Sequence, residues 1–197
     1  MQIPLVYIRA TVYNKLPEQQ AVFIYRRTKM NVELRPVLYE EKAILANLLE
    51  KYCYEFSQYD NNDVNQLGLY GYKYLDYYWT EENRWAYFII AGGKLAGVAL
   101  VNDYPEIPGS ETDFSLAEFF VLYKYRRQGI GKKAFFTVLD RHKGNWQLMR
   151  HPKNIASVHF WNKAIAEYTG GQFELIEGYA GAVYDDGTPG DIFIFRS

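Results

Sequence analysis

Two arginines and two glycines lie close together in the run Arg126-Arg127-Gln128-Gly129-Ile130-Gly131-Lys132. The run follows an apolar, β-prone stretch that ends at Val121, and apolar residues recur at helical spacing after it. A strand that leads through a glycine-containing turn into a helix is a suitable anion site, because the first N–H groups of the helix have no partner within the helix. Glycine has no Cβ atom that would keep a ligand from the backbone. The pattern predicts a pyrophosphate-binding loop.

A carboxylate, Glu118, lies three residues before the end of the preceding strand. By strand alternation its side chain shares a face with Phe120 and not with Val121. A carboxylate between aromatic side chains is expected to have a raised pKa, which suits a general base that works near neutral pH. The alternative is that Glu118 pairs with a nearby cation and has a structural role.

The overall composition narrows the class of protein. The length of 197 residues suits one domain with an extension, and 22 basic residues nearly balance 23 acidic ones. We therefore expect no nucleic-acid partner and no membrane, since no apolar run approaches the roughly 20 residues that span a bilayer. Cys53 is the only cysteine, and no His, Cys and acid combination has metal-ligand spacing, so we expect a cytoplasmic protein without a metal.

The chain divides into an N-terminal extension, residues 1–29, and a domain over residues 30–197. Residues 3–11 and 21–26 read either as a hairpin or as a loose extension. A second hypothesis is that the start is misassigned and that the protein begins at Met30.

Periodicity and turn residues predict the elements of the domain. The expected helices and strands are helices at 40–56, 130–142 and 154–169, and strands at 31–36, 84–91, 95–101, 114–121, 145–149, 173–184 and 192–196. The aromatic stretch 70–79 reads as a helix or loop that packs on the sheet, and some of its rings as the walls of an acceptor pocket. The fold class is α+β with three layers: a mixed, mostly antiparallel central sheet of about six to seven strands with helices on both faces.

The strand, the Arg-x-x-Gly-x-Gly loop and the following helix resemble the acetyl-CoA-binding core of the GNAT superfamily of N-acetyltransferases. Arg126, Gly129 and Gly131 fill its pattern [Gln/Arg]-x-x-Gly-x-[Gly/Ala]. A hairpin precedes the loop, and Asn154 opens a later helix that carries Trp161 and ends before Gly-Gly-x-Phe, as in the last motif of the family. The resemblance covers residues 31–196.

The resemblance implies acetyl-CoA as the co-substrate and assigns residues to it. The backbone of Val121, Leu122 and Tyr123 would pair with the pantetheine arm. The pyrophosphate would be held by the N–H groups of four residues: Gln128, Gly129, Ile130 and Gly131. Positive charge near the phosphates would come from Arg126, Arg127, and Lys132 or Lys133, and Asn154 would contact the pantetheine or cap the last helix. The strands of Glu118 and Trp146 would splay apart to admit the thioester.

The resemblance also implies the reaction, in which a neutral amine attacks the thioester directly and Glu118 relays the proton. Family members commonly carry a tyrosine on the last helix as general acid, whereas Trp161 stands at that position here. An indole N–H is no practical proton donor, and Tyr168, Tyr123 and His159 are unranked candidates. His142 and His151 are expected to be solvent-exposed.

Three functions follow from these observations. The leading interpretation is an N-acyltransferase that moves an acetyl group to a primary amine of a small molecule or protein, and the sequence leaves other acyl groups open. The second is a non-catalytic acyl-CoA-binding or sensor module, and the third is an aromatic-rich interaction protein with an accidental motif. Four acids could attract a cationic acceptor, and the 19 tyrosines favour an acceptor of apolar or aromatic character; the acids are Glu55, Asp60, Asp63 and Asp76. A homodimer through the last strands or the extension is a further hypothesis.

Overall fold

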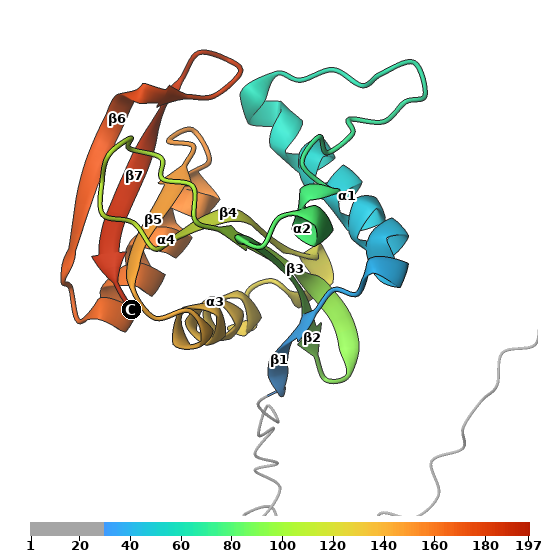
Figure 1. Ribbon diagram of the computed structural model, residues 1–197, viewed down its shortest axis with the longest axis horizontal. Coiled ribbons are helices and arrows are strands. Elements are labelled where there is room, and N and C mark those ends of the chain that lie inside the picture. The colour runs from blue at the N-terminus through green and yellow to red at the C-terminus, as the bar shows by residue number, and fades with distance from the viewer. Residues whose placement is uncertain (1–29) are drawn as a thin grey trace, which may run out of the picture.

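Residues 30–197 are described by a computed structural model, in which seven strands form one sheet in the order β1-β2-β3-β4-β5-β7-β6 (Figure 1). Every neighbouring pair is antiparallel except β4 and β5, which are parallel. The expected mixed, mostly antiparallel sheet is confirmed. Residues 1–29 lie outside the described residues. The structure therefore does not test the hairpin or loose extension expected there, or the alternative start at Met30.

The elements follow one another as predicted, with small shifts at their ends. The strands are β1 (Val32–Pro36), β2 (Arg84–Ala91), β3 (Lys94–Asn102), β4 (Phe114–Val121), β5 (Asn145–Arg150), β6 (Phe173–Val183) and β7 (Pro189–Arg196). The helices are α1 (Lys42–Asp60), α2 (Tyr77–Thr80), α3 (Ile130–Arg141) and α4 (Ile155–Thr169), with short 3-10 turns η1 (Tyr39–Glu41) and η2 (Tyr123–Tyr125).

Helices cover both faces of the sheet, and each face has its own core (Figure 1). On one face α1 buries Leu45, Leu48 and Leu49, whose spacing places them on one side of the helix, against β2 and β3. On the other face α3 and α4 pack on the sheet through apolar side chains that include Phe135 and Trp161. The sheet is therefore the middle one of three layers.

Three regions differ from the expectation by more than these small shifts. Helix α1 continues through polar residues to Asp60 and ends at Asn61, whose φ of 60° is left-handed. Strand β7 begins at Pro189, earlier than the expected 192, because Pro189 and Gly190 pair with β6 although both are turn-forming residue types. In the aromatic stretch 70–79, only the end becomes helical, as the single turn α2.

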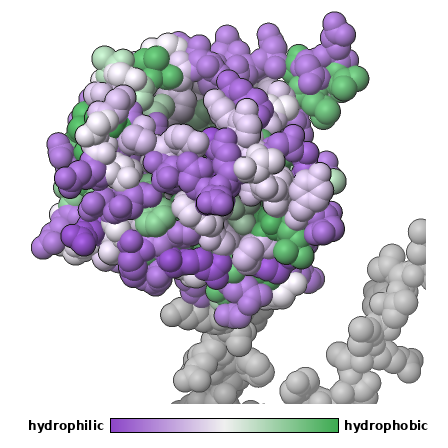
Figure 2. Space-filling model, in the orientation of Figure 1, coloured by the Kyte–Doolittle hydropathy of each residue, from purple (hydrophilic) through white to green (hydrophobic). Residues whose placement is uncertain are grey.

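The face seen in Figure 1 is mostly hydrophilic, with hydrophobic surface near the loop between α1 and α2 (Figure 2). Val64, Leu67 and Leu69 lie in that loop, and Leu67 is 82% exposed. The homodimer, expected through the last strands or the extension, remains a prediction.

Candidate active site

Strands β4 and β5 separate soon after they begin. They pair only at two positions, Phe114 with Trp146 and Ser115 with Gln147. The register of β4 against β3 shifts between Leu116 and Glu118, so that Ala117 is an extra residue. Such a bulge bends its strand and increases the local twist, which gives a physical reason for the divergence. From Leu116 onward, the edge of β4 on the side of β5 has no strand beside it.

Backbone groups of β4 alternate between β3 and this open edge. The N–H of Leu122 donates to the carbonyl oxygen of Ala96 at 2.8 Å, so Leu122 faces β3 and its neighbours Val121 and Phe119 face the opening. The carbonyl of Val121 already accepts a bond from Arg126 Nε at 2.7 Å. Of the three residues expected to pair with pantetheine, Val121 therefore faces the open edge, Leu122 faces away from it, and Tyr123 lies in η2 with an exposed ring.

The loop after β4 ends in the N-terminus of α3. Gly129 is its N-cap with a φ of 76°, and the first bond of the helix runs from Lys133 N–H to Gly129 O at 3.1 Å. The preceding N–H groups of Ile130, Gly131 and Lys132 are left for another acceptor. A Cβ atom on Gly131 would lie 3.4 Å from the Phe160 ring, so the lack of a side chain keeps this cradle open. The residues fit a pyrophosphate group at this helix N-terminus.

The positive charges expected around the phosphates are mostly engaged elsewhere. Arg126 forms two hydrogen bonds of 2.6 Å to Glu55 on α1, and Lys132 forms a 2.5 Å ion pair with Glu167. Lys133 donates to the carbonyl of Met30. Arg127 is exposed and has no ion-pair partner within residues 30–197. Of these side chains, it is the one that the structure leaves available to a phosphate.

Asn154 has the second of its two expected roles. Its side-chain oxygen accepts a hydrogen bond of 3.1 Å from the N–H of Ser157, which caps α4. A contact with pantetheine stays a prediction.

Glu118 lies on the α1 face of β4, together with Phe120, as strand alternation predicts. It is partly buried, and burial raises the pKa of its carboxyl to about 7. Hydroxyl groups of Tyr52 and Tyr72 oppose this shift by hydrogen bonding, and the negative charge of Glu106 adds to it. A carboxyl with a pKa near 7 can both accept and release a proton at neutral pH.

A set of rings, the aromatic cluster, surrounds this carboxylate; its members are Tyr52, Phe56, Tyr72, Phe120 and Tyr184. Ring centroids are 5.7 Å apart for Tyr52 and Phe56, and also for Phe56 and Tyr184. The members come from α1, the loop before α2, β4 and the start of the turn after β6. Tyr72 comes from the stretch 70–79 that was expected to wall an acceptor pocket.

Glu106 is a member of the site that the sequence did not indicate. It lies in the loop between β3 and β4, among residues that look like an ordinary turn. That loop is fixed beside the fork of β4 and β5, because Ile107 N–H donates to Gln147 Oε1 at 3.0 Å and Gln147 Nε2 donates to Ser110 Oγ at 2.6 Å. Burial raises the pKa of Glu106, which is partly buried.

None of the four acids expected to attract a cationic acceptor faces Glu118. Glu55 binds Arg126, and Asp76 forms an ion pair with Lys42. Asp60 accepts a bond from Asn62 Nδ2 at 2.8 Å, and Asp63 is exposed in the loop after α1. The acid whose charge raises the pKa of Glu118 is instead Glu106, in the loop between β3 and β4.

The structure does not bring the three candidate general acids, Tyr168, Tyr123 and His159, together with Glu118, and Trp161 stands at the position where the family has tyrosine. Trp161 is buried among Phe119, Phe135 and Phe160. The hydroxyl of Tyr168 donates to Asp140 and accepts a bond from Lys143. Tyr123 is 85% exposed, and His159 is exposed.

Two histidines are buried, contrary to the expectation that solvent surrounds them. His142 hydrogen-bonds the Tyr87 hydroxyl at 2.8 Å and lies beside the rings of Trp85 and Phe114, because it ends α3 directly over three strands. The ring of His151 contacts that of Tyr184 at a tilt, with centroids 4.4 Å apart, and its Nε2 is 3.5 Å from Asp186. Within residues 30–197, no three His, Cys, Asp or Glu side chains are grouped to hold a metal ion.

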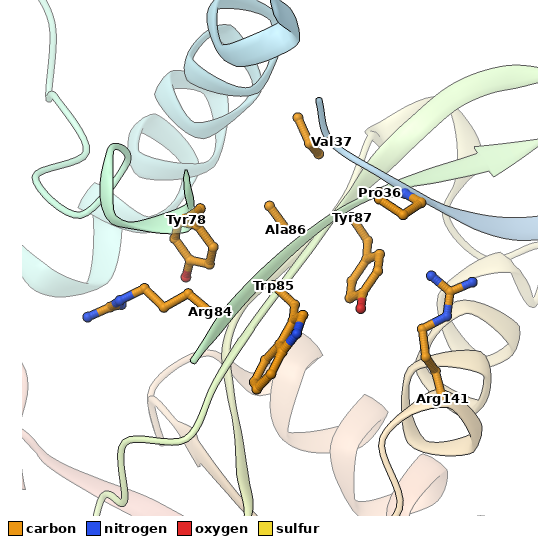
Figure 3. A pocket seen from close by; sticks show the side chains of 8 residues that line it. All are labelled: Pro36, Val37, Tyr78, Arg84, Trp85, Ala86, Tyr87 and Arg141. Carbon is orange, nitrogen blue, oxygen red and sulfur yellow. The ribbon is translucent and has the colours of Figure 1, made fainter. Parts of the chain in front are cut away.

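A hollow of about 500 Å³ lies at the edge of β2, beyond the end of β1 (Figure 3). Tyr78 lies on one side of the strand, and Tyr87 and Arg141 on the other. Its lining contains no carboxylate, so it offers no base to an amine.

Comparisons with known proteins agree with this geometry. The family model described as "Acetyltransferase (GNAT) family" matches residues 45–165, and the chain belongs to this family of acetyltransferases. Among curated protein sequences, none matches the chain. No helix within residues 30–197 is both long enough and apolar enough to cross a membrane.

Solved structures of acetyltransferases share the fold. A Thermus thermophilus acetyltransferase is 12% identical, with a TM-score of 0.58 over 85% of this chain and 97% of that one. Spermidine N-acetyltransferase from Vibrio cholerae, solved with CoA and spermine, is 12% identical, with a TM-score of 0.57 over 83% and 92%. The ribosomal L7/L12 alpha-N-protein acetyltransferase RimL is 16% identical, with a TM-score of 0.59 over 84% and 90%.

Proposed function

We propose that the protein is an acetyl-CoA-dependent N-acetyltransferase that acts on a primary amine, with Glu118 as the general base. The observation that carries the proposal is the position of Glu118. Its carboxylate lies on β4, at the fork with β5, and the same strand leads through Val121 to the N-terminus of α3. A ligand whose pyrophosphate lies at α3 and whose arm follows the open edge of β4 would end beside this carboxylate.

The structure suggests how the two ends of such a ligand are held. The N–H groups of the first turn of α3 bind the pyrophosphate, and Arg127 adds charge. The backbone groups of Phe119 and the N–H of Val121 bind the arm as a further strand would, since the carbonyl of Val121 already accepts a bond from Arg126. Support for CoA comes from two of the structural neighbours, which were solved with it.

When bound, acetyl-CoA supplies a thioester, whose C–S bond breaks as the amine nitrogen forms a C–N bond. The proton that leaves the nitrogen passes to Glu118, and the departing sulfur takes a proton from solvent, since none of the three candidate general acids lies together with Glu118. Tyr52 and Tyr72 keep their protons, because burial raises their pKa values, so their hydroxyl groups are able to donate to the carboxylate. Direct attack is favoured over a thiol intermediate, because burial and the nearby Glu118 raise the pKa of Cys53 to about 12.

A second candidate, a non-catalytic CoA-binding module, is favoured by one observation: Trp161 stands where family members commonly have tyrosine, and it is buried. Calorimetry of acetyl-CoA with the full chain and a free-thiol release assay with a panel of amines separate the two. The proposal predicts binding together with turnover of at least one amine. Binding without turnover of any amine would support the module.

A matched pair of variants tests the role of Glu118. Glu118→Gln should lower kcat/KM by about 100-fold or more and leave the Kd of acetyl-CoA unchanged. Glu111→Gln changes an exposed acid in the loop of Glu106 and should retain full activity. Equal activity of Glu118→Gln and the unaltered protein would rule out Glu118 as the base.

A further inference from the structure

Two carboxylates of the site lack a cationic partner. No lysine, arginine or histidine of residues 30–197 forms an ion pair with Glu106 or Glu118. Both side chains are partly buried, and burial of an unpaired charge is unfavourable. A cationic substrate would supply the partner that both carboxylates lack when they are ionised.

Cations on the neighbouring elements are engaged and do not fill this role. Four of them are held by other acids: Arg126 by Glu55, Arg84 by Glu81, Arg150 by Asp191, and Lys153 by Asp186. Lys51 donates to the carbonyl of Asn47, and Lys73 lies 5.5 Å from the ring centroid of Tyr74. The pair of Arg150 and Asp191 is almost fully buried, with side chains 2% and 8% exposed. None of these four cations can bind Glu106 or Glu118 without leaving the acid that it now binds unpaired.

The aromatic cluster also favours a cation. Tyr52, Phe56 and Tyr184 follow one another at centroid distances of 5.7 Å and extend from α1 to the turn after β6. Burial raises the pKa of the Tyr184 hydroxyl, and the negative charges of Glu106 and Glu118 add to this effect. Aromatic faces attract ammonium groups, and the attraction is stronger where water is excluded.

Hydrogen bonds to Gln147 fix the position of the loop that carries Glu106. Its bonds through Ile107 and Ser110 both go to Gln147, which is buried and pairs with Ser115 at the fork. Glu106 is therefore placed relative to the same fork that places Glu118.

We propose that the acceptor is a compact amine with a second positive charge, whose reacting nitrogen lies at Glu118 and whose other cationic group lies at Glu106 beside the aromatic cluster. The proposal rests on the proposed function, because it assigns the acceptor of that reaction. Glu106 is here a specificity residue that contacts the substrate away from the reacting atoms.

The test compares three amines of similar chain length: pentylamine, the diamine cadaverine, and aminovaleric acid, which has a carboxylate in place of the second amine. The proposal predicts a kcat/KM for cadaverine about 10- to 100-fold above that for pentylamine, with aminovaleric acid the poorest substrate. Glu106→Gln should remove the advantage of cadaverine, so that its kcat/KM falls to about that for pentylamine measured with the same variant. Glu111→Gln is the matched control in the same loop and should keep the preference.

Calorimetry of cadaverine and pentylamine with the CoA-bound protein adds a readout that does not require turnover. Tighter binding of cadaverine supports the acceptor class even if no amine is acetylated, a result that would contradict the proposed function alone. Equal kcat/KM and equal affinity for the two amines would overturn the acceptor class and leave the transferase function intact. A preference for cadaverine that survives in Glu106→Gln would also overturn it.

Discussion

The guanidinium group of Arg126 binds the carboxylate of Glu55 through two hydrogen bonds of 2.6 Å, and its Nε donates to the carbonyl of Val121 at 2.7 Å. The first residue of the Arg-x-x-Gly-x-Gly motif therefore joins α1 to the end of β4. It holds the α1 face, with Tyr52 and Phe56, in place relative to the strand that carries Glu118. Arg126 is a positioning residue in this structure.

Loss of this pair should reduce stability. Arg126→Ala should lower the free energy of unfolding by about 1–2 kcal/mol, because the pair is bidentate but its side chains are 32% and 43% exposed. Urea denaturation of Arg126→Ala, Glu55→Gln and the double variant gives the coupling energy, for which we expect about 1 kcal/mol. Strict additivity of the two single variants would show that the pair contributes nothing.

Arg127 should affect ligand binding without affecting stability. Since it is exposed and has no ion pair within the described residues, Arg127→Ala should change the unfolding free energy by less than about 0.5 kcal/mol. It should raise the Kd of acetyl-CoA about fivefold, and less so in high salt, because salt screens an exposed charge. Lys132→Ala is the comparison, since Lys132 is already paired with Glu167. A larger loss of affinity in Lys132→Ala would reverse the assignment of these two charges.

Substitution of Gly131 should weaken the binding of acetyl-CoA without changing the stability of the fold. An alanine in the first turn of α3 gains about 0.5–1 kcal/mol of helix preference over glycine, which offsets a tight contact of its Cβ with Phe160 at 3.4 Å. Gly131→Ala should therefore unfold at nearly the same urea concentration as the unaltered protein. Its Kd for acetyl-CoA should rise about tenfold or more, because the methyl group occupies the cradle. Unchanged affinity would place the pyrophosphate elsewhere.

Much of the fold could be predicted because its strands are local patterns. Strands β2 and β4 have the predicted bounds, since continuous apolar and aromatic residues fill them. The end of α1 and the start of β7 were missed where polar or turn-forming residues, Ser57 to Asp60 and Pro189 to Gly190, adopt the neighbouring element's conformation. Tertiary packing overrides local preference at such positions.

The site was less predictable, since its charge pairs join distant segments. Arg126 and Glu55 are 71 residues apart, so neither the engagement of Arg126 nor that of Glu55 can be found from spacing. Glu106 likewise becomes part of the site only because Gln147 on β5 holds its loop. The face of Glu118 could be predicted because strand alternation fixes it, whereas its role as a base was implied by the resemblance to the family.

The raised pKa of Glu118 should also change how stability depends on pH. Its pKa lies near 7 in the folded chain, above the ordinary value of 4.5, so between these values the folded state holds a proton that the unfolded state has released. This carboxyl therefore favours folding at low pH and loses that contribution as pH rises to about 7. Urea denaturation near pH 5 and pH 8 should show a smaller loss of stability in Glu118→Gln than in the unaltered protein. Equal losses would contradict the raised pKa.

The pH dependence of kcat/KM tests the central claim most directly, since a general base must be deprotonated to act. The unaltered protein should lose activity below an apparent pKa of about 7. Deprotonation of the amine substrate adds its own pH dependence to kcat/KM. This contribution is the same for all variants as long as the same amine is used. In Glu118→Gln the inflection near pH 7 should vanish and only the slope of the amine should remain. An inflection near pH 7 that persists in Glu118→Gln would show that another group accepts the proton.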